Sequence, residues 1–176
     1  MRWFCIVGGM IPPPEFFQHY FSYVIWGDLR QLEIVRQLPE SEIERDRGFS
    51  FGSIRKVLAH EYAAQSVWLD RFEGMQAVWL GEDAKLGMLA KIAELWPALH
   101  ERGRRYMSTL TAERLASNLN YTNLRGDEFS LPLWEVIFHM CQHSYYHRGQ
   151  LNSMIKMSGG KPKSVDYSTW VAERSS

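Results

Sequence analysis

The sequence predicts an all-α fold, a four-helix bundle, with a short hairpin as an option before the last helix. Four long stretches carry apolar residues at spacings of three and four, which is the period of a helix buried along one face. The chain has 176 residues, of which 45% are hydrophobic, enough for the core of one domain and too many for a disordered chain. We therefore expect one bundle domain over residues 14–176, preceded by a flexible N-terminal extension over residues 1–13.

The first helix is expected over about residues 14–38. It follows Pro12-Pro13-Pro14, and proline is tolerated in the first turn because its missing N–H would have no partner there. Pro39 disfavours helical backbone at the residue before it, so the helix should stop there. The apolar stripe comprises Phe16, Phe17, Tyr20, Val24, Leu29, Leu32, Val35 and Leu38. The charged, glycine-containing stretch 39–52 is expected to be a loop.

The second helix is expected over about residues 53–73, with Ser53 as its N-cap. Glu61 lies within its apolar stripe and His60 lies at the edge. A buried carboxylate is costly unless it is paired, hydrogen-bonded or bound to a metal. Glu61 is therefore the candidate for a catalytic base or a further ligand, with an ion pair to an arginine of the third helix as the alternative.

The third helix is expected over about residues 84–109, where Pro97 should either kink it or mark its true first turn. After it, Thr111 can cap a short helical turn. The segments 119–123 and 128–130 flank an Arg-Gly-Asp turn, which predicts either a small hairpin or an extended crossover.

The last helix carries the chemistry of the chain. It is expected to hold Pro132 in its first turn and to end at Gly159-Gly160. His143 and His147 are four residues apart, so their side chains lie one above the other and can share one metal ion. Such a pair arises by chance on many helices, but in a bundle His60 of the second helix can face both and supply a third ligand.

Several neighbours of this pair are expected to be structural. His139 should be a core residue or pack around the ligands, Arg148 and Gln150 should tie the helix to its neighbours, and Gly149 should allow close packing. Cys141 has no basic partner in sequence that would make it a nucleophile. A second apolar side of the helix should meet a partner subunit or the first helix, and it comprises Trp134, Phe138, Cys141 and Tyr145.

The charge, hydrophobicity and cysteine content of the chain exclude several classes of protein. Lys and Arg number 20 and Asp and Glu number 20, so no basic field exists to attract nucleic acid. No stretch is long and apolar enough to span a membrane. Neither of the two cysteines, Cys5 and Cys141, belongs to a Cys-x-x-Cys pair, which excludes a zinc ribbon and indicates free thiols in a reducing cytoplasm.

The chain resembles the DinB family, also grouped with YfiT-like metal-dependent hydrolases, from about Pro14 to Trp170. The resemblance rests on the motifs Tyr23-x-x-Trp26, Ser53-Ile54-Arg55-x-x-Leu58-x-His60 and His143-x-x-x-His147-Arg148-Gly149-Gln150. It implies an up-down-down-up bundle, usually a homodimer, and a divalent metal, nickel or zinc, held by His60, His143 and His147. Two positions depart from the common pattern: Tyr146 stands where many members have histidine, and Gln142 where many have asparagine.

Three protein ligands leave room for water or substrate, which is the arrangement of a catalytic metal site. The favoured function is a metal-dependent enzyme acting on a small molecule, either a transferase of low-molecular-weight thiols such as bacillithiol or mycothiol, or a hydrolase. The competing interpretation is a stress-linked bundle that binds a metal or ligand without catalysis. Binding of DNA fits poorly with the zero net charge.

Overall fold

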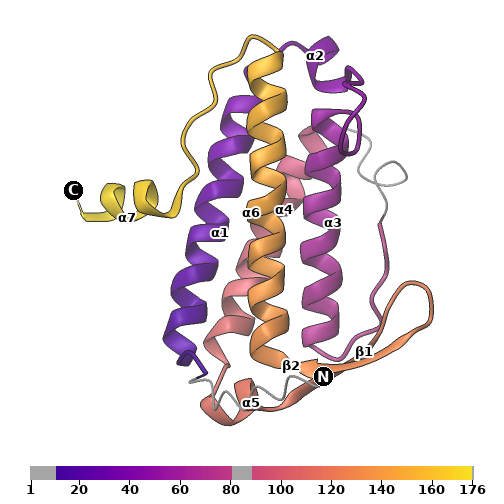
Figure 1. The fold of residues 1–176 in the computed structure, drawn as a ribbon, viewed down its shortest axis with the longest axis vertical. Helices are drawn as coiled ribbons and strands as arrows, with labels where there is room; N and C mark the ends of the chain where they lie inside the picture. Colours follow the sequence, from indigo (N-terminus) through magenta and orange to yellow (C-terminus); the bar gives the residue numbers. More distant parts are fainter. Residues whose placement is uncertain (1–10, 81–88, 176) are drawn as a thin grey trace, which may run out of the picture.

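The computed structural model describes residues 11–80 and 89–175. Four long helices pack lengthwise into a bundle (Figure 1), which confirms the all-α prediction. Their bounds are α1 Pro14–Val35, α3 Ile54–Phe72, α4 Leu89–Ser108 and α6 Leu133–Met157. Most of the expected extension and the expected start of the third helix lie outside the described residues, at 1–10 and 81–88.

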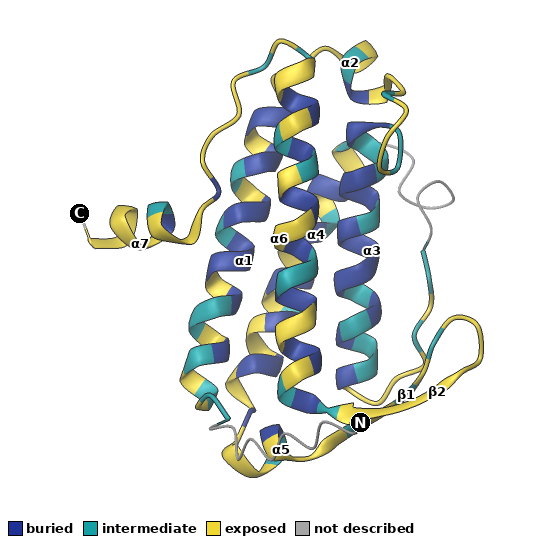
Figure 2. Cartoon of the chain, in the orientation of Figure 1, coloured by how far each residue is buried: buried dark blue, intermediate teal, exposed yellow. Residues whose placement is uncertain are grey.

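The arrangement places α1 and α3 each against both α4 and α6. In Figure 1, α1 and α6 run up the page while α3 and α4 run down it. Their apolar stripes face inward, and the outer faces of the helices, the hairpin and α7 (Tyr167–Ser175) carry most of the exposed residues (Figure 2). No described helix is both long and apolar enough to cross a lipid bilayer.

Side-chain caps begin two of the described helices. The Ser53 hydroxyl accepts a hydrogen bond from the Lys56 backbone N–H at 3.3 Å and so caps α3 as expected. The Thr111 hydroxyl accepts one from the Arg114 N–H at 3.1 Å and caps the short helix α5, Ala112–Ala116. The helix α4 continues through Pro97, so the alternative in which this proline begins the helix is wrong.

The stretch 39–52 is not entirely a loop, because it contains the short helix α2, Glu40–Glu44. The carbonyl of Pro39 accepts from the N–H groups of Glu42 and Ile43, and Ile43 is buried. Pro39 therefore follows the end of one helix and leads directly into another. Its fixed φ suits the position before a helix as well as it disfavours helical backbone in the residue that precedes it.

The segment before α6 is a hairpin, which decides between the two predicted alternatives. Strand β1 (Asn118–Thr122) pairs antiparallel with β2 (Glu128–Pro132), and Tyr121 lies opposite Phe129. Pro132 is the last residue of β2 and the N-cap of α6, one residue earlier than expected.

One buried carboxylate joins all four long helices. Asp28 of α1 accepts hydrogen bonds from Gln65 of α3 at 2.8 Å and from His100 of α4 at 3.0 Å. It also forms an ion pair at 3.2 Å with Arg148 of α6, whose guanidinium donates to the carbonyl of Val24 at 2.8 Å. Arg148 is fully buried, which confirms the prediction that it ties the last helix to its neighbours.

Two helical glycines have opposite surroundings. A Cβ added at Gly27 of α1 would lie 2.3 Å from Nη1 of Arg148, a guanidinium that Asp28 and Val24 hold in place. A Cβ added at Gly149 of α6 would meet nothing within 4 Å. The prediction that Gly149 serves close packing is therefore wrong, whereas Gly27 does have that role.

We expect Gly27→Ala to lower the free energy of unfolding by about 1–3 kcal/mol, because the added methyl group displaces the buried guanidinium. The matched variant Gly149→Ala should raise it by about 0.5–1 kcal/mol, because alanine loses less backbone entropy in a helix than glycine. Urea denaturation of the wild type and both variants measures this difference. A change of the same sign in both variants would contradict the assignment.

Candidate metal centre

Three histidines that are far apart in the sequence meet at the seam between α3 and α6. Each of His60, His143 and His147 offers one ring nitrogen to a group in which all three atoms lie within 4.8 Å of one another. The Nε2 atom of His143 is 3.4 Å from Nε2 of His60 and 3.2 Å from Nε2 of His147. The structure thus brings together the three residues that the sequence singled out.

These separations fit the requirements of a metal ion. Two ligands at 2.0–2.1 Å from a tetrahedral zinc ion are about 3.3 Å apart. Cis ligands at about 2.1 Å from an octahedral ion are closer, at about 3.0 Å. The two separations that involve His143 are therefore those of neighbouring ligands on one divalent cation, and the three rings could hold such an ion.

The protonation states also fit. Burial and, to a smaller extent, the neighbouring rings of His147, His60 and His139 together lower the pKa of His143 to about 3. Burial also lowers the pKa of His147, although its hydrogen bond to Gln150 acts in the opposite direction. Both imidazoles are therefore neutral near pH 7, which is the form that binds metals.

The tautomer of His147 is fixed by Gln150. The amide oxygen of Gln150 lies 2.7 Å from Nδ1 of His147 and also accepts a hydrogen bond at 2.7 Å from the Ser50 hydroxyl. Because this oxygen can only accept, Nδ1 of His147 must carry the proton. Its Nε2 then presents a lone pair to the other two histidines, so Gln150 does more than tie α6 to its neighbours.

The segment before α3 forms a wall of the site. Phe51 stacks on the ring of His60 with centroids 4.0 Å apart, and the ring of Trp79 lies 5.4 Å from it on another side. Ser50 has a φ of +55°, a strained conformation for a non-glycine residue that aims its hydroxyl at Gln150. Sequence reasoning missed these residues, because a loop has no periodicity that would reveal its contacts.

Solvent reaches the cluster from one side. His60 and His143 are half-buried, whereas His147 is only 4% exposed. A site sealed in the core would suit a purely structural metal, and one at the edge of the bundle leaves access for a small molecule.

Glu61 points elsewhere. Its side chain is 1% exposed, and neither carboxylate oxygen has a hydrogen-bond partner among the described residues. Burial raises the pKa of Glu61 well above its usual value, Asp28 raises it further, and Arg148 lowers it. The electrostatic neighbours of Glu61 are thus the polar residues of the core, and the arginine near it belongs to α6 and not, as expected, to the third helix.

Two further residues of α6 can now be placed. His139 is exposed, so it is not a core residue, although its ring centroid lies 5.9 Å from that of His143. Cys141 is a free thiol that is 1% exposed, and burial raises its pKa to about 12. A thiol of this kind stays protonated and is a poor nucleophile.

Comparison with known proteins identifies the family and the fold. The sequence profile of the DinB family matches residues 13–174. The "Protein DinB" of Bacillus subtilis (strain 168) is 26% identical over 156 residues, which cover 86% of this chain and 91% of that protein. The crystal structure of a DinB-like protein from Bacillus cereus ATCC 10987 superposes with a TM-score of 0.65 at 15% identity, over 88% of this chain and 99% of that one. At that identity the structural likeness shows the fold alone.

The low pKa of His143 makes the stability of the metal-free protein depend on pH. Below its ordinary pKa of 6.5, His143 binds a proton in the unfolded chain but not in the folded one until the pH approaches about 3. Protonation of the unfolded state therefore lowers the free energy of unfolding as the pH falls, by at most about 1.4 kcal/mol per pH unit and less with solvent screening.

Urea denaturation of metal-free protein between pH 7.5 and 4.5 measures this slope. The His143→Asn variant should lose part of the slope, and the difference between variant and wild type removes the contributions of other titrating groups. Identical slopes in the two proteins would contradict a lowered pKa.

Proposed function

Because the chain belongs to the DinB family, we propose that it is a metal-dependent enzyme in which His60, His143 and His147 hold one divalent cation. The observation that carries this proposal is the convergence of three ring nitrogens within 4.8 Å at a half-buried edge of the bundle. A cation bound there supplies Lewis acidity, which lowers the pKa of a coordinated water or thiol or polarises a carbonyl. We propose nickel or zinc as the cation, since imidazole ligands suit both.

The protein contributes orientation and a low-dielectric wall. Gln150 keeps Nδ1 of His147 protonated, and a fixed tautomer strengthens a histidine ligand. The rings of Phe51 and Trp79 shield His60 from water on two sides, which strengthens electrostatic interactions at the site. This environment suits a small-molecule reaction, either transfer of a low-molecular-weight thiol to an electrophile or hydrolysis.

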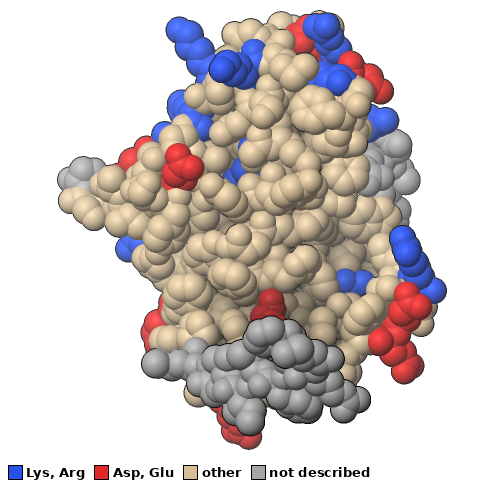
Figure 3. Space-filling view, in the orientation of Figure 1, with Lys and Arg blue, Asp and Glu red and all other residues tan. Residues whose placement is uncertain are grey.

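A homodimer is part of the proposal. The second apolar side of α6 meets α1 in part, since Phe138 stacks on Tyr20 with centroids 5.9 Å apart. Phe138 and Tyr145 nevertheless stay 39% and 42% exposed. Figure 3 shows an uncharged central surface over α1 and α6, with charges of both signs gathered around its edge. An exposed aromatic face of this kind is typical of a subunit interface.

We expect purified protein reloaded with zinc to bind one ion per chain, and His143→Ala to lose it, because two ligands at most remain. The matched control is His139→Ala, which removes a histidine one turn away on the same helix. Metal analysis after extensive dialysis measures the stoichiometry. One zinc ion per chain in His143→Ala would remove the proposed site.

Turnover separates the enzyme from a non-catalytic bundle. Low-molecular-weight thiols are screened against an electrophile such as chlorodinitrobenzene, and simple esters and amides are screened for hydrolysis, with zinc-loaded and metal-free protein. Activity that requires the metal and His143 supports the proposal. Equal rates for loaded and metal-free protein favour a bundle that binds metal or ligand without catalysis.

The role of Glu61 as a catalytic base is tested by Glu61→Gln. The raised pKa of Glu61 favours the protonated carboxyl, to which the glutamine amide is close to isosteric and isoelectronic. We therefore expect zinc stoichiometry to be unchanged and turnover to stay within about threefold of the wild type, against the 10²–10⁴-fold loss typical of a deleted base. A loss of that size with zinc retained would establish Glu61 as the base.

A further inference from the structure

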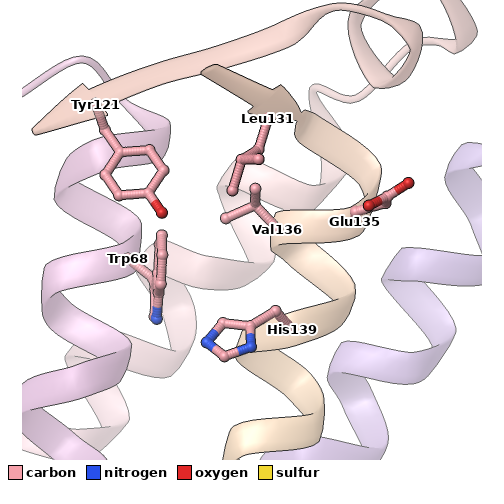
Figure 4. A pocket seen from close by; sticks show the side chains of 6 residues that line it. All are labelled: Trp68, Tyr121, Leu131, Glu135, Val136 and His139. Atoms are coloured by element: carbon pink, nitrogen blue, oxygen red, sulfur yellow. The ribbon is translucent and has the colours of Figure 1, made fainter. Parts of the chain in front are cut away.

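A hollow lies on the α3–α6 seam beside the hairpin (Figure 4). The candidate metal centre lies farther along the same seam. We call it the aromatic hollow. Its volume is about 280 Å³. It is lined by Trp68, Tyr121, Leu131, Glu135, Val136 and His139, which come from α3, both strands of the hairpin and α6.

The hollow is one side chain away from the metal centre. The ring of His139 lies 5.4 Å from the indole of Trp68, and on its other side 5.9 Å from the ring of His143. A molecule seated against Trp68 and His139 therefore has its neighbouring atoms beside a candidate ligand. This proximity distinguishes the aromatic hollow from the other apolar hollow, which lies between α1, α6 and α7 and is lined by Tyr20, Phe138 and Tyr145 among others.

The walls present ring faces and alkyl groups. Tyr121 meets Trp68 edge to face, with centroids 5.3 Å apart and planes at 76°. Val136 lines the hollow and is buried. Leu131 of β2 also lines the hollow and is 39% exposed. A flat, apolar group gains area burial and edge-to-face contacts in such a site.

Charge selects against cations. The guanidinium of Arg71 already lies 4.6 Å from the ring centroid of Trp68 and 4.7 Å from that of Tyr121, so a cationic ligand on these rings would be repelled. The same guanidinium would attract an anion, and the carboxylate of Glu135 at the rim points away from Trp68 and Tyr121 in Figure 4. The charges around the hollow therefore disfavour a positively charged ligand.

Volume sets the size of the ligand. A cavity of roughly 150 Å³ takes benzene. The aromatic hollow, at about 280 Å³, therefore has room for a substituted ring or a fused pair of rings.

We propose that the aromatic hollow binds an aromatic group of the substrate that carries no positive charge and places the reacting group of that substrate beside the metal centre. The second half of this statement rests on the proposed function, whereas the first concerns binding alone. The substrate class is then small aromatic or similarly flat apolar molecules, and Trp68, Leu131 and His139 are residues that determine specificity.

Calorimetric titration with naphthol, which is neutral at pH 7, tests the binding on zinc-loaded and on metal-free protein. We expect one site per chain in both forms. Naphthylmethylammonium, which carries a positive charge, should bind at least about tenfold more weakly, a difference of about 1.4 kcal/mol.

Two variants of the hollow and one matched control locate the site. Leu131→Trp fills it from an exposed strand position, so folding should be unaffected, and Trp68→Ala removes a wall. Each should weaken naphthol binding at least about tenfold. Leu131→Trp does so by occupying the space of the ligand, and Trp68→Ala does so by removing a central aromatic contact. Tyr145→Ala, in the hollow on the other side of α6, should leave the dissociation constant within about twofold.

Naphthol binding that is undetectable in the wild type, unchanged in Leu131→Trp or lost in Tyr145→Ala would overturn the proposal. The zinc stoichiometry of the same samples keeps the two ideas apart. A wild type that binds naphthol but no zinc refutes the metal-dependent enzyme and leaves the aromatic hollow standing, and the converse result refutes the hollow alone.

Discussion

The structure depends on the carboxylate of Asp28, at which all four long helices meet. The carboxylate of Asp28 accepts hydrogen bonds from Gln65 of α3 and His100 of α4 and forms an ion pair with Arg148 of α6. All four side chains are buried. A buried ion pair adds little net stability compared with apolar packing, because its charges lose their hydration. Its directional bonds instead favour one rotation of each helix over the alternatives that apolar residues alone would allow. Apolar side chains supply the driving force, and Asp28 selects the arrangement.

Orientation of the histidines comes from outside the core. The loop before α3 brings Ser50 to Gln150 and Phe51 to His60, and left-handed backbone at Gly48, Ser50 and Gly52 makes its path possible. The same loop is attached to the end of α6, where Arg47 donates to the Ser158 hydroxyl. The protein alone therefore holds the rings close together. Such preorganisation reduces the entropy lost when a metal binds.

Much of the fold could be predicted from the sequence, because helical periodicity and capping are local signals. Ser53 and Thr111 cap helices as expected, and His143 and His147 share a face because their spacing requires it. To predict that His60 meets His143 and His147, the bundle fold was needed in addition to the spacing of the residues. Features that depend on tertiary contacts were missed or misjudged. Asp28 carries no local pattern, Ser50 and Phe51 lie in a loop, and Gly149 resembles a packing glycine although it faces open space.

The core and the candidate site are coupled through neighbouring residues. On α3, His60 faces the other histidines while Glu61 faces Asp28 and Arg148 in the interior. On α6, likewise, His147 faces the other histidines while Arg148 faces Asp28 in the interior. Successive residues on a helix point about 100° apart, so the rotation that buries Glu61 and Arg148 also turns their predecessors toward the α3–α6 seam. A rotation of either helix by one residue would bring a histidine toward Asp28 and take a ligand from the cluster. The polar core therefore helps to bring the histidines together, because it sets the rotation of both helices that carry them.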